Sequence, residues 1–112
     1  MALNRWSESI LIAELNDEPA FSEDMELLMR EVDEPESSPD IIVDLRGVCR
    51  LNSSNLAQLL RLRKKIAARG RRLRMCSVND QVWSVLLVTG LDGVFDFTDD
   101  VSTSLASLQI DG

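Results

Sequence analysis

The feature that most constrains this chain is a regular alternation of short apolar runs with longer amphipathic stretches. The apolar runs have the length of buried strands, and the stretches between them carry apolar residues at the three- and four-residue spacings of a helix face. The runs cover residues 9–15, 41–45, 73–78 and 94–97, and the stretches cover residues 21–32, 54–69, 80–89 and 101–108. This order predicts an α/β fold with a largely parallel sheet and right-handed crossovers.

Boundary residues mark the ends of the predicted helices. Ser22 is a suitable N-cap for the first helix, and Asn79 or Asp80 for the third. Gly70 and Gly90 follow the second and third helices, at the position where a left-handed C-cap is favoured. The inner stripe of the second helix is predicted to comprise Leu56, Leu59, Leu60, Arg63, Ile66 and Ala67.

The chain has 112 residues, the length of one ordinary domain. No internal repeat or long linker divides it, so residues 1–112 are expected to form a single domain. Before the first helix only one convincing strand fits, and residues 3–6 offer at most a short edge strand.

Composition argues against catalysis and against metal binding. The sequence contains no histidine, which excludes a Ser-His-Asp triad, a histidine base and an imidazole zinc ligand. Its two cysteines, Cys49 and Cys76, lie too far apart for a CxxC motif. No Gly-rich phosphate loop is present either. We therefore expect no enzymatic activity, no cofactor and no metal.

The charge balance favours a protein partner over nucleic acid. Twelve basic residues against nineteen acidic ones give a net charge of −7. Eight of the twelve basic residues nevertheless lie between Arg61 and Arg74, which predicts either a solvated helix face or a basic patch for an acidic partner. No apolar run is long enough to span a membrane and no secretory leader is seen, so a cytoplasmic location with free thiols is expected.

The region from Ile41 to Phe95 carries a family resemblance. An apolar strand ends in Val43-Asp44-Leu45 and is followed by Gly47-Val48; the next landmarks are Leu51-Asn52-Ser53-Ser54-Asn55-Leu56, a basic helix ending at Gly70, and Leu87-Val88-Thr89-Gly90-Leu91. This arrangement resembles the STAS domain, the fold of bacterial anti-sigma factor antagonists. The resemblance implies a STAS-like single domain, with four to five strands in a mixed, largely parallel sheet and about four helices.

The same resemblance implies a site. The family pattern Asp-Ser-Ser/Thr-Gly-Leu falls on residues 52–56, so the serine that a partner kinase phosphorylates corresponds to Ser53. The partner-binding residues would be Asn52, Ser53, Ser54, Asn55 and Leu56, and the partner an anti-sigma factor or serine protein kinase. Asn52 lacks the charge of the family's aspartate, and Asn55 adds a side chain where the family has glycine.

The residues themselves allow two interpretations of this loop. Asn52, Ser53 and Ser54 precede a long helix, where side-chain oxygens cap free backbone N–H groups. The same helix end favours negative charge, so it would accept a phosphate without unfolding. A regulatory switch and an ordinary helix cap are both consistent with the sequence.

Other functions stay open at this stage. The chain could be a STAS adaptor or scaffold subunit that is not phosphorylated, either stressosome-like or transporter-associated, and it could form a homodimer. A nucleotide- or lipid-handling module is a third hypothesis, because a helix N-terminus can hold an anion.

Overall fold

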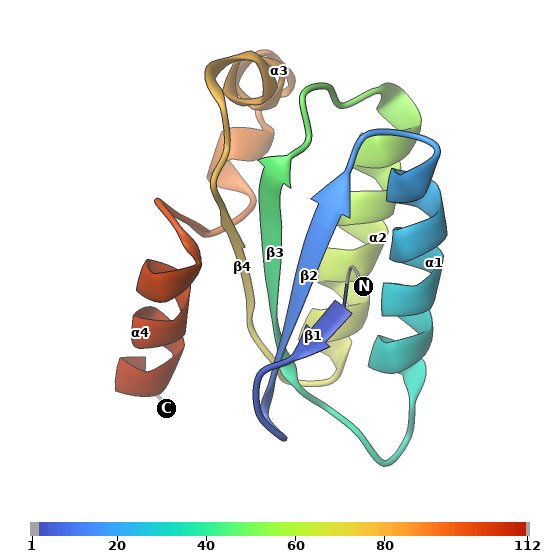
Figure 1. The fold of residues 1–112 in the computed structure, drawn as a ribbon, viewed down its shortest axis with the longest axis vertical. Coiled ribbons are helices and arrows are strands. Elements are labelled where there is room, and N and C mark those ends of the chain that lie inside the picture. Colours follow the sequence, from blue (N-terminus) through green and yellow to red (C-terminus); the bar gives the residue numbers. More distant parts are fainter. Residues whose placement is uncertain (1–2, 112) are drawn as a thin grey trace.

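The computed structural model describes residues 3–111, and a five-stranded sheet forms the centre of this region. The strands lie in the order β1-β2-β3-β4-β5 (Figure 1). β1 is antiparallel to β2, and the other neighbours are parallel. The strand bounds are Leu3–Arg5 (β1), Ile10–Asn16 (β2), Asp40–Gly47 (β3), Leu73–Cys76 (β4) and Phe97–Thr98 (β5). The expected mixed, largely parallel sheet is confirmed.

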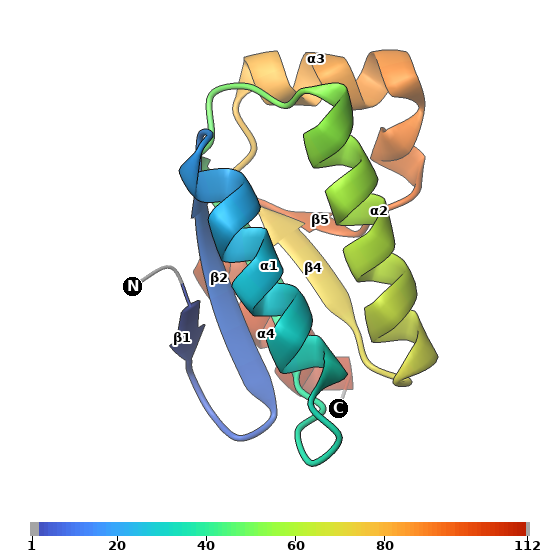
Figure 2. The same cartoon turned by 90° about the vertical axis from the view of Figure 1, so that its right-hand side faces the viewer.

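Four α-helices surround the sheet within the described residues: α1 (Ala20–Asp33), α2 (Ser53–Ala68), α3 (Asp80–Thr89) and α4 (Val101–Asp111). α1 and α2 cover one face, α4 lies against the other, and α3 crosses the end at which β2 and β3 terminate (Figures 1 and 2). This arrangement places the start of α2 beside α3 at the carboxyl edge of the sheet. Parallel α/β sheets commonly bind their ligands at this edge.

The core has two parts of unequal size. The larger one lies between the sheet and the helices α1, α2 and α3, and includes Phe21, Met25, Leu59 and Leu62. The smaller one lies under α4 and consists of Ile10, Ile12, Ile42, Cys76 and Leu108, with Val101 and Leu105 packed against it. The central strand β3 is buried on both faces, as its continuous apolar sequence predicts.

Several predicted boundaries are confirmed. The Asn79 side chain accepts a hydrogen bond from the backbone N–H of Val82 and caps α3. Gly70 and Gly90 adopt φ angles of 69° and 77°, the left-handed conformation that favours glycine after a helix. The short edge strand near the N-terminus is β1.

Two local predictions are wrong. Ser22 does not cap α1, which begins at Ala20; the carboxylate of Glu18 instead accepts the Ser22 backbone N–H at 2.8 Å. The last strand is not residues 94–97, because the chain forms a 3-10 turn over Leu91–Gly93 and pairs with β4 only at Phe97–Thr98. A two-residue strand is too short to show the alternation by which sequence reasoning finds strands.

The predicted inner stripe of α2 is right only in part: Leu59 and Ile66 are buried and Leu56 is half-buried, but the other three members are exposed. The buried residues are Asn55, Leu59, Leu62 and Ile66, whereas Leu60 is 39% exposed and both Arg63 and Ala67 are exposed. The observed stripe keeps the spacing of four, three and four residues that defines a helix face. Asn55, the first member of this stripe, was not predicted to be buried because it is polar, and the capping of α2 explains its burial.

Candidate protein-binding site

The loop between β3 and α2 carries the candidate site. It leaves the sheet at Gly47 and enters the helix at Ser53. Val48 and Leu51 are buried and hold the loop against the core. The Asn79 Nδ2 atom donates to the carbonyl oxygen of Val48 at 3.0 Å, which ties the loop to the cap of α3.

Asp17, at the end of β2, fixes the middle of this loop. Its Oδ1 atom accepts the backbone N–H groups of Cys49 at 2.8 Å and of Arg50 at 3.2 Å. Because these bonds favour the ionised form, with the Cys49 N–H contributing most, the pKa of Asp17 lies below its ordinary value. The loop therefore has a fixed shape although it lies at the surface.

The start of α2 is closed by a reciprocal pair of asparagines. The Asn55 backbone N–H donates to Oδ1 of Asn52 at 2.8 Å, and the Asn52 backbone N–H donates to Oδ1 of Asn55 at 3.0 Å. This is a capping box in which asparagine replaces the usual Glu or Gln at the third helical position. Asn52 and Asn55, the two residues that depart from the family pattern, therefore each cap the backbone N–H of the other.

Asn55 is directed into the fold, with only 2% of its surface exposed. Its Nδ2 atom donates to Oε2 of Glu18 at 3.0 Å and to Oε1 of Gln58 at 3.4 Å. Gln58 in turn donates to the Ser22 hydroxyl, which hydrogen-bonds to Glu18. The Ser22 bonds, together with the weaker one from Asn55, hold the pKa of Glu18 below its ordinary value. Asn55 therefore positions the loop, and its side chain does not form part of the outer surface.

Ser53 is the exposed first residue of α2. Its hydroxyl makes no hydrogen bond within residues 3–111, and Ser54 beside it is also exposed. The first turn of α2 contains no acidic residue that would oppose an added negative charge. The chain has no histidine, so no imidazole of its own can act as a base toward the Ser53 hydroxyl.

Apolar side chains are exposed on the neighbouring helices. Leu87 and Val88 of α3 are 50% and 87% exposed, and Leu60 of α2 is exposed as well. Val85 of α3 is half-buried. Leu56, the last residue of the predicted site, is half-buried and packs on the main core.

Sequence reasoning missed Asp17, Glu18 and Gln58 as parts of this site. Two carboxylates that directly follow a strand, at the carboxyl edge of a parallel sheet, are a usable signal for such a site. Asp44 lies within β3 and does not end the strand; its Oδ1 accepts the Arg46 backbone N–H of the same strand at 3.0 Å. Residues 3–111 bring no three Cys, Asp or Glu side chains together in a way that could hold a metal ion.

Known proteins share this architecture. The chain aligns with a STAS domain protein of Planctomyces limnophilus at 18% identity and a TM-score of 0.81, covering 96% of both chains. A sulfate transporter family protein of Wolinella succinogenes aligns at 22% identity and a TM-score of 0.78. The alignment covers 90% of this chain and 85% of the transporter family protein. Phosphorylated SpoIIAA, a cell fate determinant of Bacillus, aligns at 14% identity and a TM-score of 0.72. The alignment covers 94% of this chain and 95% of SpoIIAA. A search of curated proteins gives no match.

None of the helices in the described region is both long and apolar enough to cross a membrane. The sequence model of the STAS domain matches residues 4–104, which include every strand from β2 to β5 and the whole α2 loop. The order of strands and the capped helix after β3 agree with that match. On this basis, the chain belongs to the STAS domain family.

Proposed function

We propose that this chain is an anti-sigma factor antagonist that binds an anti-sigma factor with a serine kinase fold in the cytoplasm. The unit of function is residues 1–112 as one STAS-like domain, acting without catalysis. The observation that carries the proposal is the exposed, unbonded hydroxyl of Ser53 on a rigid loop at the start of α2. The surface that meets the partner comprises Asn52, Ser53, Ser54 and Leu56, with Asn55 supporting them from inside.

Phosphorylation of Ser53 would end this binding. A phosphoserine adds about −1.5 to −2 charges and three acceptor oxygens. At the N-terminus of α2 the added charge faces free backbone N–H groups, so the domain stays folded while its outer surface changes in charge and bulk. The phosphorylated SpoIIAA structure has the same fold, which supports a switch that acts on binding.

The direct test is phosphorylation by a purified anti-sigma factor of the serine kinase class with ATP, followed by mass spectrometry. We expect phosphate on Ser53, and none on a Ser53→Ala variant. If the kinase modifies another known substrate but leaves Ser53 unmodified, the switch is contradicted.

A binding experiment tests the consequence. Ser53→Asp should weaken binding to the anti-sigma factor, whereas Ser53→Ala should retain it. Ser102→Asp is the matched control, because Ser102 is an exposed serine in the first turn of α4, on the other face of the sheet. Binding that falls equally in the Ser53→Asp and Ser102→Asp variants would indicate a general effect of charge.

A second candidate function is a STAS adaptor that is never phosphorylated. The Asn52–Asn55 capping box favours it, because these amides replace the charge and the glycine of the family pattern. For an adaptor, Ser53→Asp and Ser53→Ala should have the same effect on assembly with the partner. The two functions therefore separate in the same set of variants.

A further inference from the structure

We propose that a cleft at the β5 edge of the sheet, between α3 and the turn that precedes α4, binds a lysine or arginine side chain of a protein partner. The cleft has a volume of about 240 Å³ and is lined by Val78, Trp83, Phe97, Thr98 and Asp99. None of these residues belongs to the loop that carries Ser53, so the proposal does not depend on the function proposed above.

Aromatic side chains are concentrated at this cleft. The chain has two tryptophans, three phenylalanines and no tyrosine, and three of these five rings are in contact through Phe97. The rings of Trp83 and Phe97 meet edge to face, with centroids 5.2 Å apart and planes at 89°. Both residues are half-buried and line the cleft, so the core does not cover either of them completely. The space beside an edge-to-face contact is bordered by a face of each ring, and such faces attract cations.

Asp99 supplies a carboxylate beside the rings. It is exposed, and within residues 3–111 its side chain forms neither an ion pair nor a hydrogen bond. The Asp99 carbonyl accepts the Ser77 backbone N–H at 3.1 Å, which holds this position against the end of β4. Asp100 adds a second negative charge: its Oδ1 accepts the backbone N–H and the hydroxyl of Thr103 at 2.8 and 2.7 Å, and these bonds lower the pKa of Asp100.

The helix on the other side of the cleft contributes in the same sense. Asp80 and Trp83 are three positions apart in α3, so their side chains lie on one face of the helix. Asp80 is exposed, and its side chain forms no ion pair with any residue from 3 to 111. The carboxylates of α3 and of the turn before α4 therefore both lie near the two rings.

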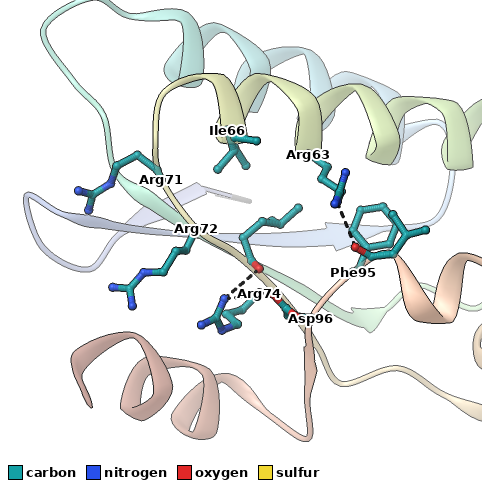
Figure 3. A pocket seen from close by; sticks show the side chains of 10 residues that line it. Arg63, Ile66, Arg71, Arg72, Arg74, Phe95 and Asp96 are labelled. Atoms are coloured by element: carbon teal, nitrogen blue, oxygen red, sulfur yellow. Dashed lines mark hydrogen bonds and ion pairs between the residues drawn. The ribbon is translucent and has the colours of Figure 1, made fainter. Parts of the chain in front are cut away.

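No basic residue offsets these charges locally. Residues 75–112 contain six aspartates and no lysine or arginine. The last basic residue of the chain, Arg74, lies beside Asp96, 3.5 Å from its carboxylate (Figure 3). The arginines of this region gather around Phe95 and Asp96, before β5 begins (Figure 3), whereas no described basic side chain lines the cleft at its end. A cation that enters the cleft is therefore attracted by Asp99 without competition from an internal cation.

The size of the cleft favours one side chain of a larger partner over a free small molecule. Sites for small molecules usually have volumes of about 300–1,000 Å³, above the volume of this cleft. The aromatic faces suit the ammonium group of lysine or the guanidinium group of arginine. Because the chain has a net charge of −7, two copies repel each other, which favours a basic segment of a different protein.

The test uses a fluorescein-labelled peptide of alternating Lys and Gly, measured by fluorescence anisotropy against the full chain. Trp83→Leu should weaken binding about two- to fivefold, the usual effect of losing a cation–π contact at an exposed site, whereas Trp83→Phe should retain most of the affinity. Trp6→Leu is the matched control and should change nothing, because Trp6 is an exposed tryptophan that follows β1, at the opposite edge of the sheet.

A second pair of variants separates this site from general charge attraction. Asp99→Asn should weaken binding about two- to fivefold, as expected for the loss of one exposed ion pair. Glu36→Gln removes the same charge from an exposed position between α1 and β3 and should have a much smaller effect. In NMR spectra, the peptide should shift the indole N–H of Trp83. Asp99 is exposed, so Asp99→Asn remains informative if Trp83→Leu fails to fold.

Four results would overturn the proposal. The first is unchanged affinity in a folded Trp83→Leu variant, and the second is an equal loss of affinity in the Asp99→Asn and Glu36→Gln variants. The third is tighter binding of tetramethylammonium than of the peptide, which would show a site for a small cation. The fourth is dimerisation of the free chain in sedimentation velocity that Trp83→Leu abolishes, which would identify a second copy as the occupant.

Discussion

The side chain of Asn55, at the third helical position of α2, donates a hydrogen bond to the carboxylate of Glu18, 37 positions earlier, with 3.0 Å between Nδ2 and Oε2. Because Glu18 also accepts the Ser22 backbone N–H, one carboxylate organises the beginnings of both α1 and α2. The shape of the Ser53 loop thus depends on a residue that precedes the first helix.

Replacing Asn55 should therefore destabilise the domain. Asn55→Ala removes an acceptor for the Asn52 N–H and the donor to Glu18, and we expect the free energy of unfolding to fall by about 1–3 kcal/mol. Urea denaturation followed by circular dichroism measures this loss. Gln109→Ala, at an exposed position of α4, should change stability by less than about 0.5 kcal/mol. A loss for Asn55→Ala no greater than that of the control would contradict the role assigned to it.

A negative charge at Ser53 should not unfold the protein. Ser53→Asp places a carboxylate in the first turn of α2, where the helix dipole stabilises it by about 0.3–1 kcal/mol. We therefore expect the Tm to stay the same or rise slightly, and the gain to shrink at high salt. A clear fall in Tm would mean that phosphorylation acts by unfolding the domain.

The loop after β3 should loosen in acid. The pKa of Asp17 is lowered in the folded state, so its stabilising effect is present above the unfolded pKa near 4 and is lost as the pH falls through the lower folded value. In NMR spectra, the backbone amides of Cys49 and Arg50 should shift as Asp17 is protonated below about pH 4. These shifts should vanish in Asp17→Asn, and their persistence would assign the titration to another group.

Two ion pairs should differ in their effect on stability. Asp40 is buried and binds both Arg71 and Arg72, so Asp40→Asn leaves two partly buried cations without their carboxylate. We expect this variant to lose about 2 kcal/mol, a value reduced because the arginines are about one-third exposed. Asp33→Asn removes only the exposed pair with Lys65 and should cost less than about 1 kcal/mol. Equal losses in denaturant titrations would refute this ranking.

The two thiols should react at different rates. Cys49 is exposed, whereas Cys76 is buried under α4, and burial raises the pKa of the Cys76 thiol. A thiol reagent at neutral pH should modify one cysteine rapidly in the native protein and the second only slowly. Prior denaturation should make both react at once, and a Cys49→Ser variant should lose the fast phase.

The element order could be predicted because the helices and the longer strands each carry a periodic signal. The α2 stripe could be predicted only in part, since Asn55 occupies a core position and only a distant carboxylate explains why an amide is tolerated there. The turn and two-residue strand after α3 were missed for another reason. Their geometry follows from packing against β4, so it leaves little trace in the local sequence.

The candidate site was predictable only in part. The motif located Ser53 at a helix start, and its exposure agrees with that expectation. The contributions of Asp17 and Glu18 depend on contacts across more than 30 positions, which a pattern in one segment does not contain.

The small apolar cluster under α4 has a consequence for native-state dynamics. Among the described residues, the apolar contacts between α4 and the sheet come from Val101, Leu105 and Leu108, so detachment of α4 exposes much less apolar surface than unfolding of the main core. Segments with few buried contacts open through sub-global fluctuations that cost less free energy than global unfolding. We therefore expect α4 to exchange its amide hydrogens first among the helices, and the Cys76 thiol to meet solvent through that opening.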